Sequence, residues 1–153
     1  MNDTIIGIIK GMLSPSIMIS ACGLLLLGMN NKYSLVVNRI RILNNEFREL
    51  QEKDQERIDC ILKQMPLLID RMKLIRNAVW LYTIGIAMFI FSIFSLGIYL
   101  FYGKSLILTI ISLVLFIIAI LSVLVGIIFA AQEVLLGFKI INIETKNIYS
   151  FKS

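Results

Sequence analysis

The residues that could act on an ion or a ligand form one polar stripe in the first apolar stretch of the chain. Its members are spaced by four, three, four and four residues, so a helix places them on one face: Ser16, Ser20, Gly23, Leu27 and Asn31. Asn30 adjoins this face, and the amides of Asn30 and Asn31 can coordinate a cation or cap backbone groups. Two interpretations stay open. Small residues and hydroxyls let membrane helices pack closely, or a ring of identical chains uses the stripe to line a narrow pore with Leu27 as its constriction.

Three charged residues are expected beside the end of this stripe. Lys32 follows Asn31 directly, and Arg39 lies two helical turns further along the same segment. Glu133 comes at the end of the last apolar run, where it can pair with Lys32 or Arg39 or remain solvated. We interpret the three as charges at the mouth of the predicted path.

A second stripe of small residues lies in the last apolar run and predicts a helix-packing face. It consists of Ala119, Ser122, Gly126 and Ala130. Small side chains at these spacings allow two backbones to approach closely in a membrane.

Groups for catalysis or metal binding are scarce. The chain has no His, and its two cysteines, Cys22 and Cys60, lie in an apolar and a charged segment, without metal-ligand spacing. Ile19–Cys22 fits the cleavage pattern of a bacterial lipoprotein, but the apolar run continues beyond it, which favours a packing role for Cys22. The sequence has no Gly-rich phosphate loop, and it has no paired carboxylates in an apolar setting. We therefore expect no enzyme activity, no cofactor and no metal site.

Composition indicates which elements must position these residues. The 153 residues are 58% hydrophobic and 16% charged, an apolar excess that a core of this size cannot hide from water. Three uncharged runs predict transmembrane helices over residues 11–31, 77–102 and 105–132, and a tight turn at Gly103 and Lys104 joins the last two. The fold class is all-α integral membrane, with residues 1–10 as an N-terminal extracytoplasmic segment.

Lys and Arg predict the orientation. Ten of the fifteen fall within residues 32–76, and three more follow Gln132. The positive-inside rule places these two regions in the cytoplasm and the N-terminus outside.

The cytoplasmic segment 32–76 predicts an antiparallel, coiled-coil-like hairpin that extends the first two spans. Apolar residues recur at alternating spacings of three and four on both sides of a polar turn at 51–56: Tyr33, Val36, Ile40, Leu43, Phe47 and Leu50, then Ile58, Ile61, Met65, Leu68, Met72, Ile75 and Val79. Residues 133–153 are expected to continue the third span as a cytoplasmic helix and tail. A kink is expected at Pro66.

One stretch resembles a known family. Ile19–Glu46 contains Asn30-Asn31-Lys32, Val36-Val37, Arg39, Arg41 and Leu43-Asn44, and is similar to the signature of a bacterial membrane family known as domain of unknown function 2721. The resemblance implies three spans and a bacterial inner (cytoplasmic) membrane, and it brings no activity.

Two functions follow as hypotheses. Three helices cannot enclose a path alone, so the first is a homo-oligomeric channel or pore for small ions, lined by the first span. The alternative is a membrane-anchored scaffold that binds a cytoplasmic protein partner through the hairpin. The lipid bilayer is the expected surrounding in both cases. The hairpin charges are mixed in sign, which does not favour nucleic acid.

Overall fold

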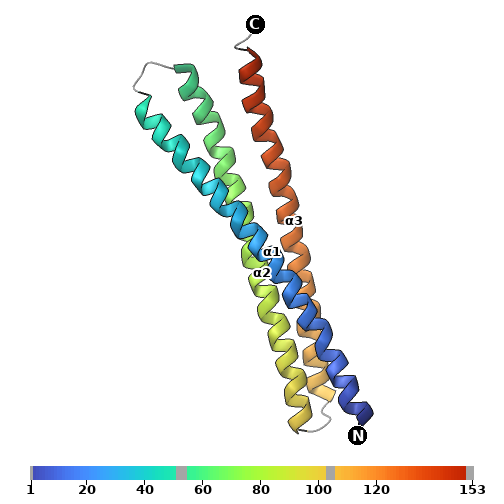
Figure 1. The fold of residues 1–153 in the computed structure, drawn as a ribbon. Coiled ribbons are helices and arrows are strands. Elements are labelled where there is room, and N and C mark those ends of the chain that lie inside the picture. Colours follow the sequence, from blue (N-terminus) through green and yellow to red (C-terminus); the bar gives the residue numbers. More distant parts are fainter. Residues whose placement is uncertain (1, 51–54, 103–105, 151–153) are drawn as a thin grey trace. The chain divides into compact units, whose positions relative to one another are not determined.

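A computed structural model describes residues 2–50, 55–102 and 106–150. The chain forms three helices, α1 (Asn2–Glu49), α2 (Gln55–Tyr102) and α3 (Leu106–Ser150), and the described residues contain no strand (Figure 1). The predicted turn at Gly103 and Lys104 and residues 51–54 of the predicted polar turn lie outside the described residues.

Each helix is long and apolar enough to cross a membrane. The helices have 48, 48 and 45 residues, and about 20 residues suffice for a hydrocarbon layer of roughly 30 Å. Each helix is therefore more than twice the length that a span requires. The sequence prediction of an all-helical protein with three membrane-length helices is confirmed.

The helices continue through several of the boundaries predicted from the sequence. α1 begins at Asn2, so most of the predicted segment 1–10 is the first part of one helix that contains Pro15. α2 continues through Pro66. α3 passes Gln132 without interruption, so residues up to Ser150 extend the helix that contains the third apolar run.

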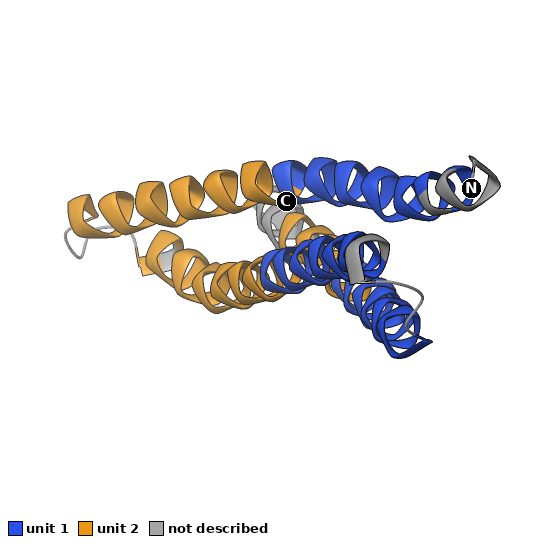
Figure 2. Ribbon diagram, turned by 90° about the horizontal axis from the view of Figure 1, so that it is seen from below, with its two compact units in different colours: residues 1–28, 79–127 blue, residues 29–78, 128–153 orange. Residues whose placement is uncertain are grey.

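The chain divides into two compact units (Figure 2). Unit 1 consists of Met1–Gly28 and Val79–Ile127, and unit 2 of Met29–Ala78 and Ile128–Ser153. Each unit therefore contains one part of every helix, and each is described by itself below.

Burial recurs every seven residues along each helix. The repeat comprises Pro15, Cys22, Met29, Val36 and Leu43 on α1, Ile61, Leu68, Ile75, Tyr82 and Phe89 on α2, and Ser112, Ala119, Gly126, Glu133 and Ile140 on α3. Seven residues are nearly two helical turns, so these positions form a narrow stripe. Most other side chains are exposed, including many large apolar ones, as expected of helices whose surroundings are lipid.

The core of unit 1 shows how α2 and α3 approach each other. The Phe89 and Phe116 rings pack edge to face with centroids 5.6 Å apart. A Cβ atom added to Gly126 would lie 2.7 Å from the Tyr82 ring, and one added to Gly85 would lie 2.8 Å from Val123. A side chain at either position would force Tyr82 or Val123 to shift, so glycine lets the two helices approach closely there.

In unit 2, the predicted apolar seams are partly buried. Val36 and Leu43 on α1 and Ile61, Leu68 and Ile75 on α2 are buried. The remaining predicted seam residues of this unit are half-buried or exposed, and Tyr33 and Phe47 are exposed.

Candidate functional site

The α1 polar face, defined as Ser16, Ser20, Gly23, Leu27, Asn30 and Asn31, is exposed at every position. The Ser16 hydroxyl donates to the Met12 carbonyl oxygen at 2.8 Å, and the Ser20 hydroxyl donates to that of Ser16 at 3.4 Å. A Cβ atom added to Gly23 would meet nothing within 4 Å. These two serines satisfy their donors within the helix, so their lone pairs remain available on the surface.

The buried side of α1 does not coincide with the α1 polar face. Pro15, Cys22 and Met29 are buried, and they lie more than 90° around the helix from the centre of the α1 polar face at about 100° per residue. The chain's own helices therefore do not cover the α1 polar face. What remains for this face is lipid, another copy of the chain, or water.

Glu133 is the centre of a charged cluster in unit 2. Its side chain is fully buried, with 0% exposed, and it accepts hydrogen bonds from two cations on two other helices. Lys32 Nζ on α1 donates to Oε2 at 2.8 Å, and Arg71 Nε on α2 donates to Oε1 at 2.5 Å. We call Lys32, Arg71 and Glu133 the ion cluster. It ties all three helices together through one carboxylate.

Gly137 lies directly against the ion cluster. It is buried one turn after Glu133, and a Cβ atom there would lie 3.4 Å from the Arg71 guanidinium carbon, an ordinary contact distance. The guanidinium therefore packs against α3 at Gly137. A buried carboxylate without partners would be costly, but both oxygens of Glu133 are paired.

The sequence predicts part of this cluster. Lys32 is one of the two predicted partners of Glu133, whereas Arg71 is not predicted, because it is one of many cations within residues 32–76. Its position carried a signal, because Arg71 falls between Leu68 and Ile75 at spacings of three and four, on the buried stripe of α2. Gln64 occupies the equivalent place one heptad earlier and is buried, whereas Arg71 is half-buried.

Arg39, the third predicted mouth charge, is half-buried, and its positive charge lies near the carboxylate of Glu46. Arg57 Nε donates to Glu46 Oε1 at 2.6 Å and joins the end of α1 to the start of α2. This hydrogen bond from Arg57 lowers the pKa of Glu46, and the positive charges of Arg57 and Arg39 lower it further. Glu46 lies in the segment predicted to be outside the membrane, and its carboxylate is held ionised near neutral pH.

The small stripe of α3 lies partly at close helix contacts. Ala119 is fully buried, and the half-buried Ser122 donates from its hydroxyl to the Leu81 carbonyl oxygen at 2.9 Å. Gly126 lies against Tyr82. Ala130, in unit 2, is half-buried.

A buried pair of serines, which was not predicted from the sequence, joins α2 to α3 in unit 1. The hydroxyls of Ser92 and Ser112 lie 3.0 Å apart, and each lies within 3.0 Å of the other residue's carbonyl oxygen. Ser95 donates to the Leu108 carbonyl oxygen at 3.1 Å, one turn away. Polar groups that bond across membrane helices hold them at short distance.

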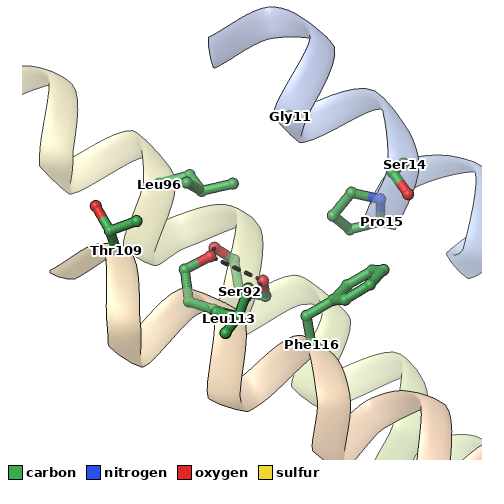
Figure 3. A pocket seen from close by; sticks show the side chains of 9 residues that line it. Gly11, Ser14, Pro15, Ser92, Leu96, Thr109, Leu113 and Phe116 are labelled. Atoms are coloured by element: carbon green, nitrogen blue, oxygen red, sulfur yellow. Dashed lines mark hydrogen bonds between the residues drawn. The ribbon is translucent and has the colours of Figure 1, made fainter. Parts of the chain in front are cut away.

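A pocket lies beside this serine pair (Figure 3). Its volume is about 210 Å³, and all three helices line it: Gly11, Ser14 and Pro15 from α1, Ser92 and Leu96 from α2, and Thr109, Ser112, Leu113 and Phe116 from α3. All of these residues belong to unit 1 and to the predicted membrane spans.

Metal ligands do not gather in the part of the chain that the structure describes. No group of three or more His, Cys, Asp or Glu residues there is placed to hold an ion. Cys22 and Cys60 are both free thiols and both buried.

The fold and these sites define the class of the protein. It is an all-helical, membrane-type protein in which each of the three helices buries a narrow stripe of side chains. The chain belongs to the family described as "Protein of unknown function (DUF2721)", which its residues 12–143 match. This finding confirms the resemblance that the stretch Ile19–Glu46 carries, including its expected extent over about residues 13–140. Comparison with curated proteins and with solved structures found no match.

Proposed function

We propose that the chain assembles into a closed homo-oligomer whose α1 polar face lines a path for small ions. One observation carries this proposal: the α1 polar face is exposed, although it lies in an apolar segment of membrane length. Hydrocarbon offers no partner to the polar atoms of this face within the span. A ring of like subunits gives them water or one another.

The proposed topology follows the distribution of charge. Spans over 11–31, 77–102 and 105–132 leave residues 32–76 and 133–153 in the cytoplasm of a bacterium and the N-terminus outside. The bond between Arg57 and Glu46 and the buried seam residues of unit 2 support a coiled-coil-like hairpin over residues 32–76.

Individual residues then take definite roles. Ser16, Ser20 and Gly23 form the wall of the path, and Leu27, with 59% of its surface exposed, forms an apolar constriction. Asn30 and Asn31 surround the cytoplasmic mouth. The ion cluster fixes the rotation of α1 at this level, because Lys32 directly follows Asn31 and is bound to Glu133.

Flux through liposomes that contain the purified protein tests the channel. Leu27→Ser should raise ion flux and Ser20→Leu should lower it, each by about tenfold or more, since a hydrophobic constriction limits conduction by dewetting. Leu25→Ser is the matched control, because Leu25 is exposed but lies about 200° around α1 from Leu27. A monomer in mild detergent, or equal effects of both leucine variants, would rule the channel out.

A scaffold that holds a cytoplasmic partner is the second candidate. The observation that favours it is the exposure of large apolar side chains in unit 2: Leu35 at 70%, Leu135 at 72% and Phe138 at 72%. A photoreactive amino acid at Phe138 should then crosslink to a different protein in intact cells. Crosslinks to lipid or to a second copy alone would count against the scaffold. Neither candidate is an enzyme or binds nucleic acid.

A further inference from the structure

The pocket of unit 1 exists because small residues from three helices meet there. Gly11 has no side chain, and the Ser92 and Ser112 side chains are short. They leave a groove of about 210 Å³ between Pro15 on α1 and Phe116 on α3 (Figure 3). The groove opens to the surface, since Gly11, Ser14, Thr109 and Leu113 are exposed.

The walls of the pocket are chemically apolar in spite of their serines. Ser92 and Ser112 engage each other and each other's carbonyl oxygens, so their polar atoms already have partners. Leu96, Leu113 and Phe116 supply hydrocarbon surface. Such walls favour an alkyl chain over water, because a water molecule needs two to four free polar partners.

Gly11 and Pro15 both line the pocket, and Pro15 removes the usual helical donor of the Gly11 carbonyl oxygen. In an α-helix, the carbonyl oxygen of Gly11 would accept from the amide of residue 15, but Pro15 has no N–H. Gly11 contributes only backbone atoms to the lining. An acceptor in an apolar setting is most stable when a ligand donates a hydrogen bond to it.

We propose that this pocket binds the alkyl chain of a hydroxyl-bearing amphiphile, with the chain against Leu96, Leu113 and Phe116 and the hydroxyl donating to the Gly11 carbonyl oxygen. The size agrees with a short chain. A dry cavity of about 150 Å³ holds benzene, so about 210 Å³ holds on the order of eight carbon atoms. The site is independent of ion conduction by the α1 polar face, and it stands whether or not the channel does.

A photoreactive octanol with a diazirine at carbon 3 tests the site on the full chain in lipid nanodiscs. Irradiation should attach the probe to residues 11–15, 92–96 and 109–116. Octan-1-ol should displace it about tenfold better than 1-methoxyoctane, which has the same chain but no donor. Adducts spread evenly over the apolar surface, or equal displacement by both compounds, would overturn the proposal.

Two variants and a control sharpen the test. Gly11→Leu should abolish labelling, because its Cβ meets nothing within 4 Å and the side chain can enter the pocket. Gly7→Leu, one turn earlier and equally open, should label like the original protein. Pro15→Ala restores the amide donor to Gly11 and should remove the advantage of octan-1-ol over its ether. Circular dichroism and elution volume show that each variant is folded, and unchanged labelling of a folded Gly11→Leu protein contradicts the site.

Discussion

At the scale of single residues, Glu133 is the group whose surroundings constrain it most. Its carboxylate is fully buried, and its partners Lys32 and Arg71 are only partly so, with 40% and 28% of their side chains exposed. The two cations reach the carboxylate from different helices and retain some contact with solvent. Removal of the carboxylate charge therefore leaves two cations close together without their common partner.

Glu133→Gln should lower the free energy of unfolding by about 1–3 kcal/mol, because it breaks a buried ionic arrangement while the cations remain. Thermal unfolding in detergent measures this effect. Asp70→Asn is the control, since Asp70 and Lys73 form an exposed pair with 56% of both side chains accessible. Such surface pairs contribute about 0–1 kcal/mol. Equal losses in the two variants would show that the ion cluster adds no particular stability.

Glu46 makes a prediction about pH. Its pKa is lowered in the folded chain by the hydrogen bond from Arg57 and by nearby positive charge. A lowered pKa means that the contribution to stability is complete above the ordinary glutamate pKa and is lost as pH falls through the folded value. A ¹³C NMR titration of the Glu46 carboxyl should show this lowered pKa, and Arg57→Gln should return it toward the ordinary value. An unchanged titration in that variant would contradict the assigned cause.

At the scale of elements, the contact of α2 with α3 depends on residues without bulk. Gly126 and Gly85 admit the Tyr82 ring and Val123, and the Ser92–Ser112 pair holds the same two helices by hydrogen bonds. Close backbone approach replaces the hydrophobic effect as the driving force between helices in lipid.

Gly126→Ala should destabilise the fold by about 1–3 kcal/mol, because the new Cβ would lie 2.7 Å from a ring that is itself buried. Gly28→Ala is the matched control on α1, where an added Cβ meets nothing within 4 Å. That change should be neutral or slightly stabilising, by up to about 1 kcal/mol, through helix propensity. Unfolding of both variants in the same detergent provides the comparison, and a tolerated alanine at position 126 would show that the contact is not tight.

How far the sequence predicts this molecule depends on whether the signal is local. The three long helices follow from uncharged runs that any spanning segment requires, and α3 begins near the start of its run. Arg71, Gln64 and Ser92 were not predicted, because a polar residue on a seam resembles a solvated one until its partners on another helix are known. The exposure of the α1 polar face likewise depends on which side of α1 packs, and that is decided by contacts far apart in the sequence.

At the scale of the whole molecule, the narrow buried stripes leave most of each helix without a partner within the described chain. On α1 this exposed surface has two sides. Ser20 and Leu27 lie on the α1 polar face, and Ala21 and Gly28 lie on another exposed side. In the proposed ring the first side meets water and the second meets lipid or neighbouring protein.

Accessibility of single cysteines along α1 tests this arrangement most directly. In a background with Cys22→Ala and Cys60→Ala, the variants Ser20→Cys and Leu27→Cys are compared with Ala21→Cys and Gly28→Cys, which lie at matching depths. A charged, membrane-impermeant methanethiosulfonate reagent, added on both sides of membrane vesicles, reacts with thiols in contact with water. The proposed channel predicts rapid modification at positions 20 and 27 and little at 21 and 28. No modification at 20 and 27, or equal modification at all four positions, would contradict a water-filled path along the α1 polar face.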